Sequence, residues 1–436
     1  MKQIAIVPIV IFAKILTWIV KVTKRGSGTA LPGLIVGRRA PWVLSYLLEQ
    51  IPHIIVVTGT NGKTTTQTML RSIIETDNQV VLTNATGANL SRGILSELLK
   101  RSNILGKISF KSALFEVEEG TLPRIVAQLK PEIIAVTNLY RDQLDAYGEI
   151  DITEKYIRTA LEKAPQARIV LNQDDPRVSK LAQGLPNEVV YVSLPEELLT
   201  HFPYEGIQSK KTKPHKQSVK AKSIQIHEDL TSEFSVEGKV GDNPITIEDI
   251  RIASPGFFHV YNALVAITIA SLIKIKPETI KAGLQNFEPA FGRGEVIMKK
   301  EGTKAVHYRL LLVKNPAGFN LNTQLIQAIP NLKILIAIND NTADGTDVSW
   351  LWDSKLEILN ESSISSITCS GTRAKDMHLR LKYAFNILPE IHTDESLDWA
   401  LQHTFETAKH GDTIFVLPTY TAMLEIRKLM GRQLEE

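Results

Sequence analysis

Short apolar runs rich in β-branched residues alternate with helical stretches through the first half of the chain, starting at His53. Six runs, each followed by turn residues or a helical pattern, read HIIVVTG, QVVLTN, SALFEV, IIAVTN, ARIVLN and EVVYVS. Strands that alternate with helices are typical of a mainly parallel sheet covered by helices. The pattern therefore predicts an α/β domain, and we place it at residues 51–290, with a helix beginning near Phe258.

A second α/β rhythm follows the Pro- and Gly-containing stretch FEPAFGRGE, residues 287–295. Its strand-like runs read HYRLLLVKN, LKILIAIND, ISSITCSG and DTIFVLPT. We therefore predict a second α/β domain at residues 296–436, joined to the first by a hinge near residue 290.

The alternation stops between Pro195 and Ser223. This segment contains six lysines and no acid between the first and the last of them: Lys210, Lys211, Lys213, Lys216, Lys220 and Lys222. We predict that 195–223 is a solvated insertion or flexible loop and that strand-like sequence resumes at Ile224. A patch that binds an anionic headgroup or a phosphate is the alternative.

The N-terminus carries a separate element at residues 1–50. Residues 4–20 read IAIVPIVIFAKILTWIV, and Lys21, Lys24 and Arg25 follow them. The run is short for a membrane span, and its charge cluster follows it, whereas a signal peptide has its charge in front. Three interpretations stay open: a helix in or against the inner membrane face, a helix packed on the globular body, or an anchor or signal. A lead-in, RGSGTALPG, and a short helical pattern, WVLSYLLEQI, complete this element.

Composition narrows the class of protein. A length of 436 residues suggests about three domains, and 43% hydrophobic residues exclude a wholly disordered chain. A net charge of +3 gives no reason to expect nucleic-acid binding. The single cysteine, Cys369, excludes an intrachain disulfide and a cysteine-rich zinc site, and it favours a reducing, cytoplasmic compartment.

The stretch VTGTNGKTTT, residues 57–66, lies between a strand-like run and a helical pattern. Glycines let backbone N–H groups of such a loop turn toward phosphate oxygens, a lysine meets the β- and γ-phosphates, and a hydroxyl holds Mg²⁺. The match to the phosphate-loop template is partial, because Val57 stands where the template has its first glycine and Gly59 is the nearest substitute. We predict a nucleotide-binding site formed by Thr60, Asn61, Gly62, Lys63, Thr64 and Thr65.

A carboxylate ends the run SALFEV. Glu116 stands at this position, and strand alternation places it on the same face as Glu118. Ligands of an open parallel sheet bind at the carboxyl ends of the strands, so we expect Glu116 to complete the Mg²⁺ site with Thr64. A solvated turn is the alternative, and it is favoured more for Glu118 and Glu119 than for Glu116.

Two further polar segments follow strand-like runs. Asn138, Arg141 and Asp142 come after IIAVTN, where they can position phosphate, metal-bound water or the acceptor substrate; a polar turn is the alternative. The segment NQDDP, residues 172–176, follows another run, and there helix capping is favoured over contact with a base.

Arg293 lies at the expected hinge, within FGRGE. An arginine between two domains can reach the γ-phosphate of ATP when the domains close, which would couple closure to catalysis. The alternative is an interdomain salt bridge. Farther along, DNTADGTD at 340–347 carries three carboxylates but does not meet the spacing of a calcium loop.

Taken in order, these motifs resemble those of the Mur ligase superfamily, whose members use ATP to join an amine to a carboxylate. More closely, the chain is similar to the family of MurT-type subunits of lipid II isoglutaminyl synthase. The similarity runs nearly end to end, through GSGTALPG (26–33), FEVEEGTL (115–122), NLYRDQLDAYGE (138–149), AFGRGE (290–295), LVKNPAGFN (312–320), DGTDVSWLWD (344–353) and LPTYTAMLEIR (417–427). It implies a Mur-ligase-like central P-loop ATPase domain with a mainly parallel sheet, followed by a C-terminal α/β Rossmann-like domain.

The resemblance also implies an activity. The enzyme would use ATP and Mg²⁺ to amidate the α-carboxylate of D-glutamate in the stem peptide of lipid II, giving D-isoglutamine. Ammonia would come from a glutaminase-type partner subunit in a heterodimer. This chain has no evident glutaminase nucleophile, because Cys369 lies in ITCSG without a readable His partner. Lipid II would be met at the inner membrane face, with residues 1–24 as the candidate contact.

Site residues carry over by position. Lys63 would bind the β- and γ-phosphates, Thr64 and Glu116 the Mg²⁺ ion, Asn262 the adenine, and Arg293 the γ-phosphate. Asp347 would join Lys63, Glu116 and Arg293 as a catalytic residue. Lys314 and Asn315 would contact substrate, together with Arg141 and Asp142, and with Asp347 they would form the C-terminal wall of the site.

Two departures from the family pattern matter. The family usually carries a four-cysteine zinc ribbon where this chain has the Lys-rich stretch without cysteine, so no zinc is expected. The family often reads Asn-x-Tyr-Asn at the adenine helix, whereas this chain has His259 in the first position. Two other functions stay open: a Mur-type ligase that adds an amino acid to a nucleotide-linked peptide or a poly-acid, and a non-catalytic nucleotide-binding scaffold.

Overall fold

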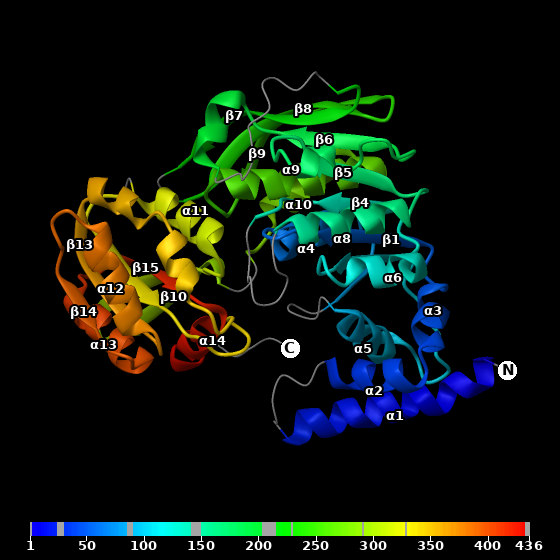
Figure 1. Cartoon of the computed structure of the whole chain (residues 1–436), viewed down its shortest axis with the longest axis horizontal. Coiled ribbons are helices and arrows are strands. Elements are labelled where there is room, and N and C mark those ends of the chain that lie inside the picture. The colour runs from blue at the N-terminus through cyan, green and yellow to red at the C-terminus, as the bar shows by residue number, and fades with distance from the viewer. Residues whose placement is uncertain are drawn as a thin grey trace.

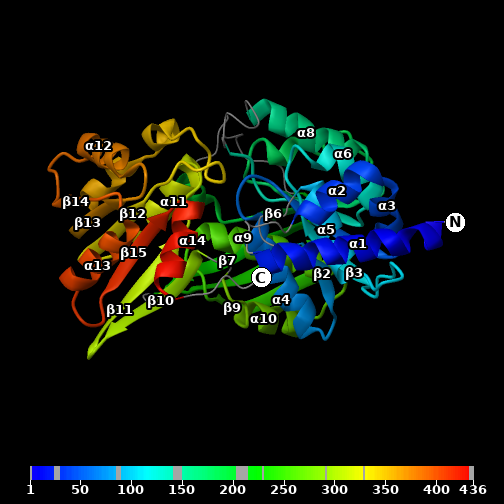
Figure 2. The same cartoon turned by 90° about the horizontal axis from the view of Figure 1, so that it is seen from below.

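Two β-sheets, each with helices on both faces, form the core of the computed structural model (Figure 1). The structure describes residues 2–23, 30–84, 90–140, 150–202, 215–227, 230–289, 292–327 and 329–431. The two sheets lie side by side in Figures 1 and 2, the first in blue to green and the second in yellow to red.

The first sheet has nine strands in the order β2-β3-β1-β4-β5-β6-β7-β8-β9. The strands are β1 (His53–Thr58), β2 (Val81–Thr83), β3 (Ser112–Glu116), β4 (Ile133–Val136), β5 (Arg168–Asn172), β6 (Val189–Ser193), β7 (Ser218–Ile226), β8 (Ser232–Val240) and β9 (Asn243–Ile252). Neighbours from β2 through β7 pair in parallel, whereas β7, β8 and β9 pair antiparallel. The six predicted runs are β1 to β6, which confirms the mainly parallel α/β sheet.

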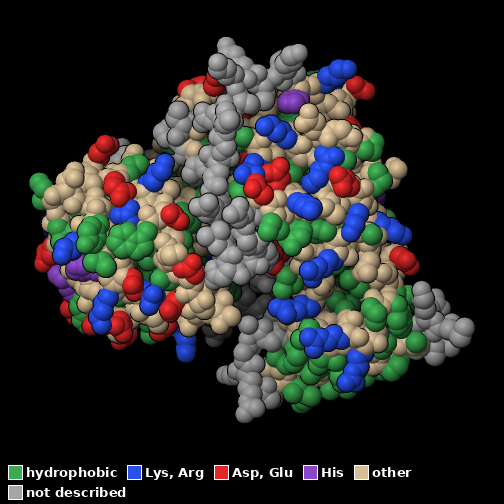
Figure 3. Space-filling model, in the orientation of Figure 1, with side chains coloured by type: hydrophobic (Ala, Val, Ile, Leu, Met, Phe, Trp, Pro, Cys, Tyr) green, Lys and Arg blue, Asp and Glu red, His purple; other side chains and the backbone are tan. Residues whose placement is uncertain are grey.

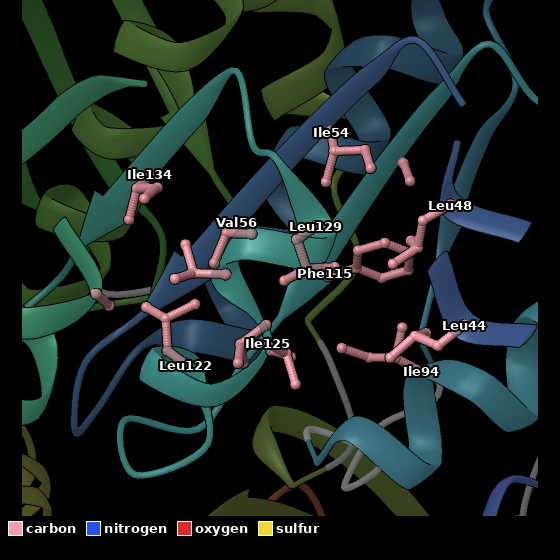
Figure 4. Packing of buried hydrophobic residues seen from close by; sticks show 14 of the residues in the cluster. Leu44, Leu48, Ile54, Val56, Ile94, Phe115, Leu122, Ile125, Leu129 and Ile134 are labelled. Carbon is pink, nitrogen blue, oxygen red and sulfur yellow. The ribbon is translucent and has the colours of Figure 1, made fainter. Parts of the chain in front are cut away.

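Strand alternation sends apolar side chains into two separate cores. In β1, Ile54 and Val56 enter one core, and Ile55 and Val57 enter the other. The helices that cover the first core are α1 (Lys2–Thr23), α2 (Leu31–Arg39), α3 (Trp42–Leu48), α5 (Ser91–Arg101), α6 (Leu122–Leu129) and α8 (Ile150–Glu162). Figure 4 shows Phe115 of β3 in this core. The second core is covered by α4 (Lys63–Thr76), α9 (Phe257–Leu272) and α10 (Pro277–Gln285).

The second sheet has six strands in the order β10-β11-β15-β12-β13-β14, parallel except for β10. They are β10 (Arg293–Glu301), β11 (Lys304–Leu311), β12 (Leu332–Ala337), β13 (Ile364–Ser370), β14 (Ile391–Thr393) and β15 (Thr413–Pro418). The face of α11 (Pro316–Ile326) and α12 (Ala374–Ala384) also carries the 3-10 turns η4 (Ser349–Asp353) and η5 (Leu356–Glu361). The helices α13 (Leu397–Thr407) and α14 (Tyr420–Leu429) cover the other face.

The N-terminal element consists of three helices: α1 (Lys2–Thr23), α2 (Leu31–Arg39) and α3 (Trp42–Leu48). Ile6, Val10 and Ala13 bury one stripe of α1 in the first core, where α1 contacts α2 and α5. This packing agrees with the helix packed on the body. No helix among the described residues combines the length and apolar character that crossing a bilayer requires.

Two local expectations are corrected by the structure. The predicted loop over 195–223 is wrong from Ser218 onward, because β7 begins there, and a 3-10 turn, η3 (Glu196–His201), also interrupts it. Val219 and Ala221 point into the core while Lys220 and Lys222 point outward, so exposed lysines concealed a two-residue alternation. The lead-in before residue 40 contains α2, which its Gly and Pro content had concealed.

Candidate active site

A glycine-containing turn joins β1 to α4 at the carboxyl edge of the first sheet. β1 lies between β3 and β4, where successive connections leave toward opposite sides of the sheet, and such a point is where ligands bind in open α/β sheets. Gly59 and Gly62 have φ angles of 120° and 86°, which disfavour any residue with a side chain. The strand–loop–helix context of the predicted nucleotide loop is therefore present.

Asn138 holds this turn in shape. Its Oδ1 accepts a hydrogen bond from the backbone N–H of Asn61 at 2.8 Å, and its Nδ2 donates to the Asn61 carbonyl at 3.0 Å. The hydroxyl of Thr137 donates to the same carbonyl at 2.7 Å. A Cβ atom at Gly59 would lie 2.4 Å from the Thr137 hydroxyl oxygen, so only glycine fits against this support. Thr60 is fixed in turn, because its hydroxyl accepts from the Tyr140 backbone N–H at 3.0 Å.

Lys63 is buried at the start of α4, and its ammonium group folds back over the turn. Nζ donates to the carbonyls of Gly59 at 2.5 Å and Thr60 at 3.2 Å. It also lies 3.4 Å from Oε1 of Glu119, a buried carboxylate. The ammonium group therefore lies next to the turn. A phosphate bound there would compete with the Glu119 carboxylate for the Lys63 ammonium group.

Thr64 and Glu116 come together beside Lys63. The Thr64 hydroxyl donates to Oε2 of Glu116 at 2.6 Å, and both residues are buried. A hydroxyl and a carboxylate next to a phosphate loop are the donors that Mg²⁺ takes with phosphate oxygens, so these residues fit the expected ion. Among the described residues there is no cluster of three or more His, Cys, Asp or Glu that could hold a metal by itself.

A second carboxylate, Glu119, also lies near the loop. The strand β3 ends at Glu116, so the alternation that paired Glu116 with Glu118 stops there. The Glu118 carbonyl instead accepts from the backbone N–H groups of Thr121 and Leu122, and the turn brings Glu119 to Lys63. In the sequence, the only sign of a carboxylate near Lys63 besides Glu116 is the pair Glu118–Glu119, shortly after the end of β3.

The helix α9 brings two polar residues to the turn. Asn262 is buried against Gly62, where an added Cβ atom would lie 2.2 Å from Asn262 Oδ1. His259, one turn earlier, is buried, and its Nδ1 has no hydrogen-bond partner within the described structure. Burial, together with the positive charge of Arg293, lowers the pKa of His259 to about 3, so the imidazole is neutral at physiological pH.

Arg293 reaches the turn from the start of β10. Its Nη1 lies 3.5 Å from the Thr65 hydroxyl, at the limit of a hydrogen bond, and its charge interacts with Glu116. The neighbouring Glu295 accepts from the Gly292 N–H and from Arg427, both at 3.1 Å, which fixes the segment. The hinge arginine therefore points into the group formed by the loop and Glu116, and no salt bridge of Arg293 across the hinge is seen among the described residues.

The second sheet contributes Asn315, which is 1% exposed at the start of α11. Its Nδ2 donates to Asn61 Oδ1 at 3.2 Å, and its Oδ1 lies 3.4 Å from Asn61 Nδ2. The same Oδ1 caps α11 by accepting from the Gly318 N–H at 2.8 Å. One side chain thus joins the nucleotide loop to the second sheet.

The other two predicted wall residues, Lys314 and Asp347, lie at the surface of the second unit. Lys314 is exposed next to Asn315. Asp347 is also exposed, and its carboxylate accepts hydrogen bonds from the backbone and hydroxyl of Ser349, which lower its pKa. Arg141 and Asp142 lie outside the described residues, so their predicted contact with substrate stays a prediction.

The NQDDP segment has a structural role. Asp175 accepts from the backbone N–H groups of Arg177 and Val178 at the start of the 3-10 turn η2 (Val178–Lys180), as the capping interpretation predicted. Burial raises the pKa of Asp174 to about 6, and this carboxyl accepts from the Tyr261 hydroxyl. The pair ties the end of β5 to α9, the helix that carries His259 and Asn262.

Comparison with known proteins identifies the class of protein to which the chain belongs. Residues 57–270 match the family model of the Mur ligase middle domain, and residues 312–423 match that of the MurT ligase C-terminal domain. MurF from Acinetobacter baumannii has a similar structure, with a TM-score of 0.65 at 18% identity over 91% of this chain and 81% of that one. MurF from Thermotoga maritima, in complex with ADP, gives a TM-score of 0.64 at 13% identity over 89% and 83%. The chain has the Mur ligase fold.

A sequence relative narrows the class to one family. The MurT subunit of the glutamine-hydrolysing lipid II isoglutaminyl synthase from Staphylococcus aureus strain N315 is 31% identical, with 94% of each chain covered. The protein belongs to the MurT family of lipid II isoglutaminyl synthase subunits, which are ligases.

Proposed function

We propose that this chain is the ligase subunit that amidates the α-carboxylate of D-glutamate in the lipid II stem peptide, using ATP and ammonia from a glutaminase-type partner. The observation that carries the proposal is the meeting of Lys63, Thr64, Glu116 and Arg293 around one glycine turn in a chain of the MurT family. In this scheme the unit at residues 51–290 binds ATP, and the unit at 296–436 closes the site.

The chemistry follows from the poor leaving group of a carboxylate. Ammonia cannot displace oxide, so a carboxylate oxygen first attacks the γ-phosphorus of ATP, and the bond to ADP breaks. The product is an acyl phosphate. The ammonia nitrogen then attacks the acyl carbon, the bond to phosphate oxygen breaks, and the nitrogen loses a proton as the amide forms. Closure of the two units around the acyl phosphate would protect it from water.

The residues at the turn suit the first step. Lys63 would leave Glu119 for the β- and γ-phosphates, and Arg293 would offset the charge that develops on the transferred group. Thr64 and Glu116 would hold Mg²⁺, which when bound neutralises phosphate charge. Asn262, against Gly62, would approach the adenine, while Lys314, Asn315 and Asp347 would line the far wall.

The location of the substrate determines the cellular location that we propose for the enzyme. Lipid II is lipid-linked, so we place the enzyme in the cytoplasm at the inner face of the membrane. The apolar residues of α1 support this placement, because several of them face outward.

The experiment is mass spectrometry of lipid II incubated with the chain, ATP, Mg²⁺ and ammonium. We expect the substrate mass to fall by about one unit as OH is exchanged for NH₂. The change Lys63→Ala should lower the amidation rate by about a hundredfold or more, because charge stabilisation at the phosphates is lost.

The control and the competing functions are read from the same assay. Lys300→Ala removes an exposed lysine of β10 and should leave the rate unchanged. A product heavier by one amino acid would instead show a Mur-type ligase that adds an amino acid. If the Lys63→Ala variant amidated lipid II as fast as the wild type, the nucleotide loop would have no catalytic role. That result would support the non-catalytic scaffold.

A further inference from the structure

The helix α1 has two apolar faces, and the residues that the structure describes bury only one of them. Ile6, Val10 and Ala13 form the buried stripe. On the other side, the side chains of Ile11, Phe12, Ile15, Trp18 and Ile19 are between 41% and 64% exposed. Within residues 5–20, every exposed side chain is apolar: Ala5, Pro8, Ile11, Phe12, Ile15, Trp18 and Ile19. A helix on a water-facing surface normally has polar residues there.

The two stripes lie opposite each other. At about 100° per residue, the buried stripe centres on one side of α1, and Ile15 lies about 180° from it. Ile11 and Phe12 lie in the turn before Ile15, and Trp18 and Ile19 lie in the turn after it, so the exposed residues form one continuous strip. Figure 2, viewed from below, shows α1 running across the surface of the molecule, and Figure 3 shows apolar side chains gathered along that lower edge.

Basic residues far outnumber acids in the sequence of the N-terminal element. The first 48 residues contain seven basic residues and no acid before Glu49: Lys2, Lys14, Lys21, Lys24, Arg25, Arg38 and Arg39. Arg38 and Arg39 are exposed at the end of α2. On α5, Arg92, Lys100 and Arg101 are exposed, and the acid of that helix, Glu97, is buried and pairs with the last two. Figure 3 shows Lys and Arg side chains directly beside the apolar edge.

We propose that the strip Ile11, Phe12, Ile15, Trp18 and Ile19 is a membrane-docking surface that inserts into a bilayer bearing anionic lipids. Apolar side chains with an aromatic residue suit the boundary between headgroups and acyl chains, and a basic surround suits anionic headgroups. Because Ile6, Val10 and Ala13 hold α1 against α2 and α5, the helix lies flat along the membrane and does not cross it. Lys14 adds to this attachment, since its Nζ donates to the Lys100 carbonyl at 3.0 Å.

This inference rests on the proposed function only for the presence of a lipid-linked substrate. A body docked through α1 holds its nucleotide loop at a fixed height above the bilayer, within reach of a peptide that is attached to a lipid. Docking therefore raises the local concentration of substrate and does not take part in the chemistry.

Vesicle flotation with the full-length chain tests the surface. We expect binding to phosphatidylcholine vesicles enriched in phosphatidylglycerol, weaker binding to phosphatidylcholine alone, and a further decrease at high salt. The double change Phe12→Glu with Trp18→Glu should lower the partition coefficient at least about tenfold, because two inserted side chains become charged. Trp18→Phe should keep the binding but remove the part of the tryptophan fluorescence that brominated acyl chains quench.

A matched control distinguishes binding through this surface from nonspecific hydrophobic binding to vesicles. Tyr383→Glu with Ile387→Glu makes the same kind of change at two exposed apolar residues of the second unit, and it should leave vesicle binding unchanged. Equal binding by the α1 double variant and the wild type would overturn the proposal. So would a wild-type chain that ignores vesicles but forms a dimer that the α1 variant breaks, because a second copy would then cover the strip.

Activity on a lipid-free muramyl peptide distinguishes the two proposals. The α1 double variant should amidate this soluble substrate at the wild-type rate, while its rate on lipid II in vesicles falls. If vesicle binding fails but soluble amidation stands, the docking surface alone is wrong. If no variant or wild-type chain amidates either substrate while vesicle binding is intact, the proposed function is wrong.

Discussion

At the scale of single residues, the protonation of His259 is coupled to folding. Its pKa is about 3 in the folded chain, against about 6.5 for an ordinary histidine, because it is buried beside Arg293. Between these values the unfolded chain binds more protons, so the free energy of unfolding rises with pH. The contribution is complete above about pH 6.5 and is lost as pH falls toward 3, at up to about 1.4 kcal/mol per pH unit.

We therefore expect His259→Asn to flatten this dependence. The variant should lose less stability than the wild type when pH is lowered from about 7 to about 5, because the group that takes up a proton on unfolding is absent. Thermal or urea unfolding at several pH values measures it. His410→Asn serves as the control, since this exposed histidine accepts from the Ala305 N–H through Nδ1 and asparagine offers a similar acceptor. Parallel pH curves for wild type and His259→Asn would contradict the prediction.

The residues of the phosphate loop could be predicted because their chemistry is local. The sequence places Lys63 and Thr64 at a helix start after a strand, and Glu116 at the end of a neighbouring parallel strand, so topology alone brings them together. Glu119 could not be predicted in the same way, because its position depends on how the chain turns after β3. Asn315 was expected through family resemblance, yet its contact with Asn61 spans 254 positions and depends on how two units pack.

At the scale of secondary-structure elements, the close approach of α2 and α5 depends on Gly33. Its N–H donates to the Ser96 hydroxyl oxygen at 2.8 Å, and an added Cβ atom would lie 1.9 Å from the Arg92 carbonyl oxygen. We expect Gly33→Ala to push the helices apart and to lower the unfolding free energy by about 2 kcal/mol or more. Loss of thermal stability in the full-length chain is the measurement.

Gly37 provides a matched control within the same helix. Among the described residues, a Cβ atom there would meet only the Leu95 side chain, at 3.4 Å. Gly37→Ala should therefore leave stability unchanged or raise it by up to about 1 kcal/mol, because alanine favours the helix. Equal effects of the two substitutions would show that helix propensity, and not close packing at Gly33, decides the result.

The sequence predicted the elements whose buried and exposed positions differ clearly in residue type or whose residues favour that secondary structure. It did not predict the elements that lack these features. The strands β1 to β6 are β-branched and end in turn residues, so their sequence indicates them directly. β7 was missed because its outward positions are lysines. α2 was missed because Gly33 and Gly37 are poor helix residues, and tertiary packing against α5 outweighs that local preference. Pro32 lies in the first turn of α2, where proline fits a helix.

At the scale of the whole molecule, the site exists only where the two sheets meet. The first sheet supplies the turn, Thr64, Glu116 and α9, and the second supplies Arg293 and Asn315. Arg293 stands at the first residue of β10 and Asn315 directly before α11, so both are fixed to the framework of the second unit. Movement of that unit would carry both side chains together, which is how one closing motion can complete a site.

The amide pair of Asn61 and Asn315 makes this coupling testable. Asn315→Ser should keep the cap of α11, since serine also accepts from the helix N–H groups, but it is too short to reach Asn61. We expect normal thermal stability, nearly normal ADP affinity, and amidation turnover lower by about tenfold, because only closure is impaired. Asn315→Ala should lose the cap as well and be less stable by about 1 kcal/mol. Calorimetric ADP binding and steady-state amidation separate the two effects, and full turnover by Asn315→Ser would mean that the units close without this contact.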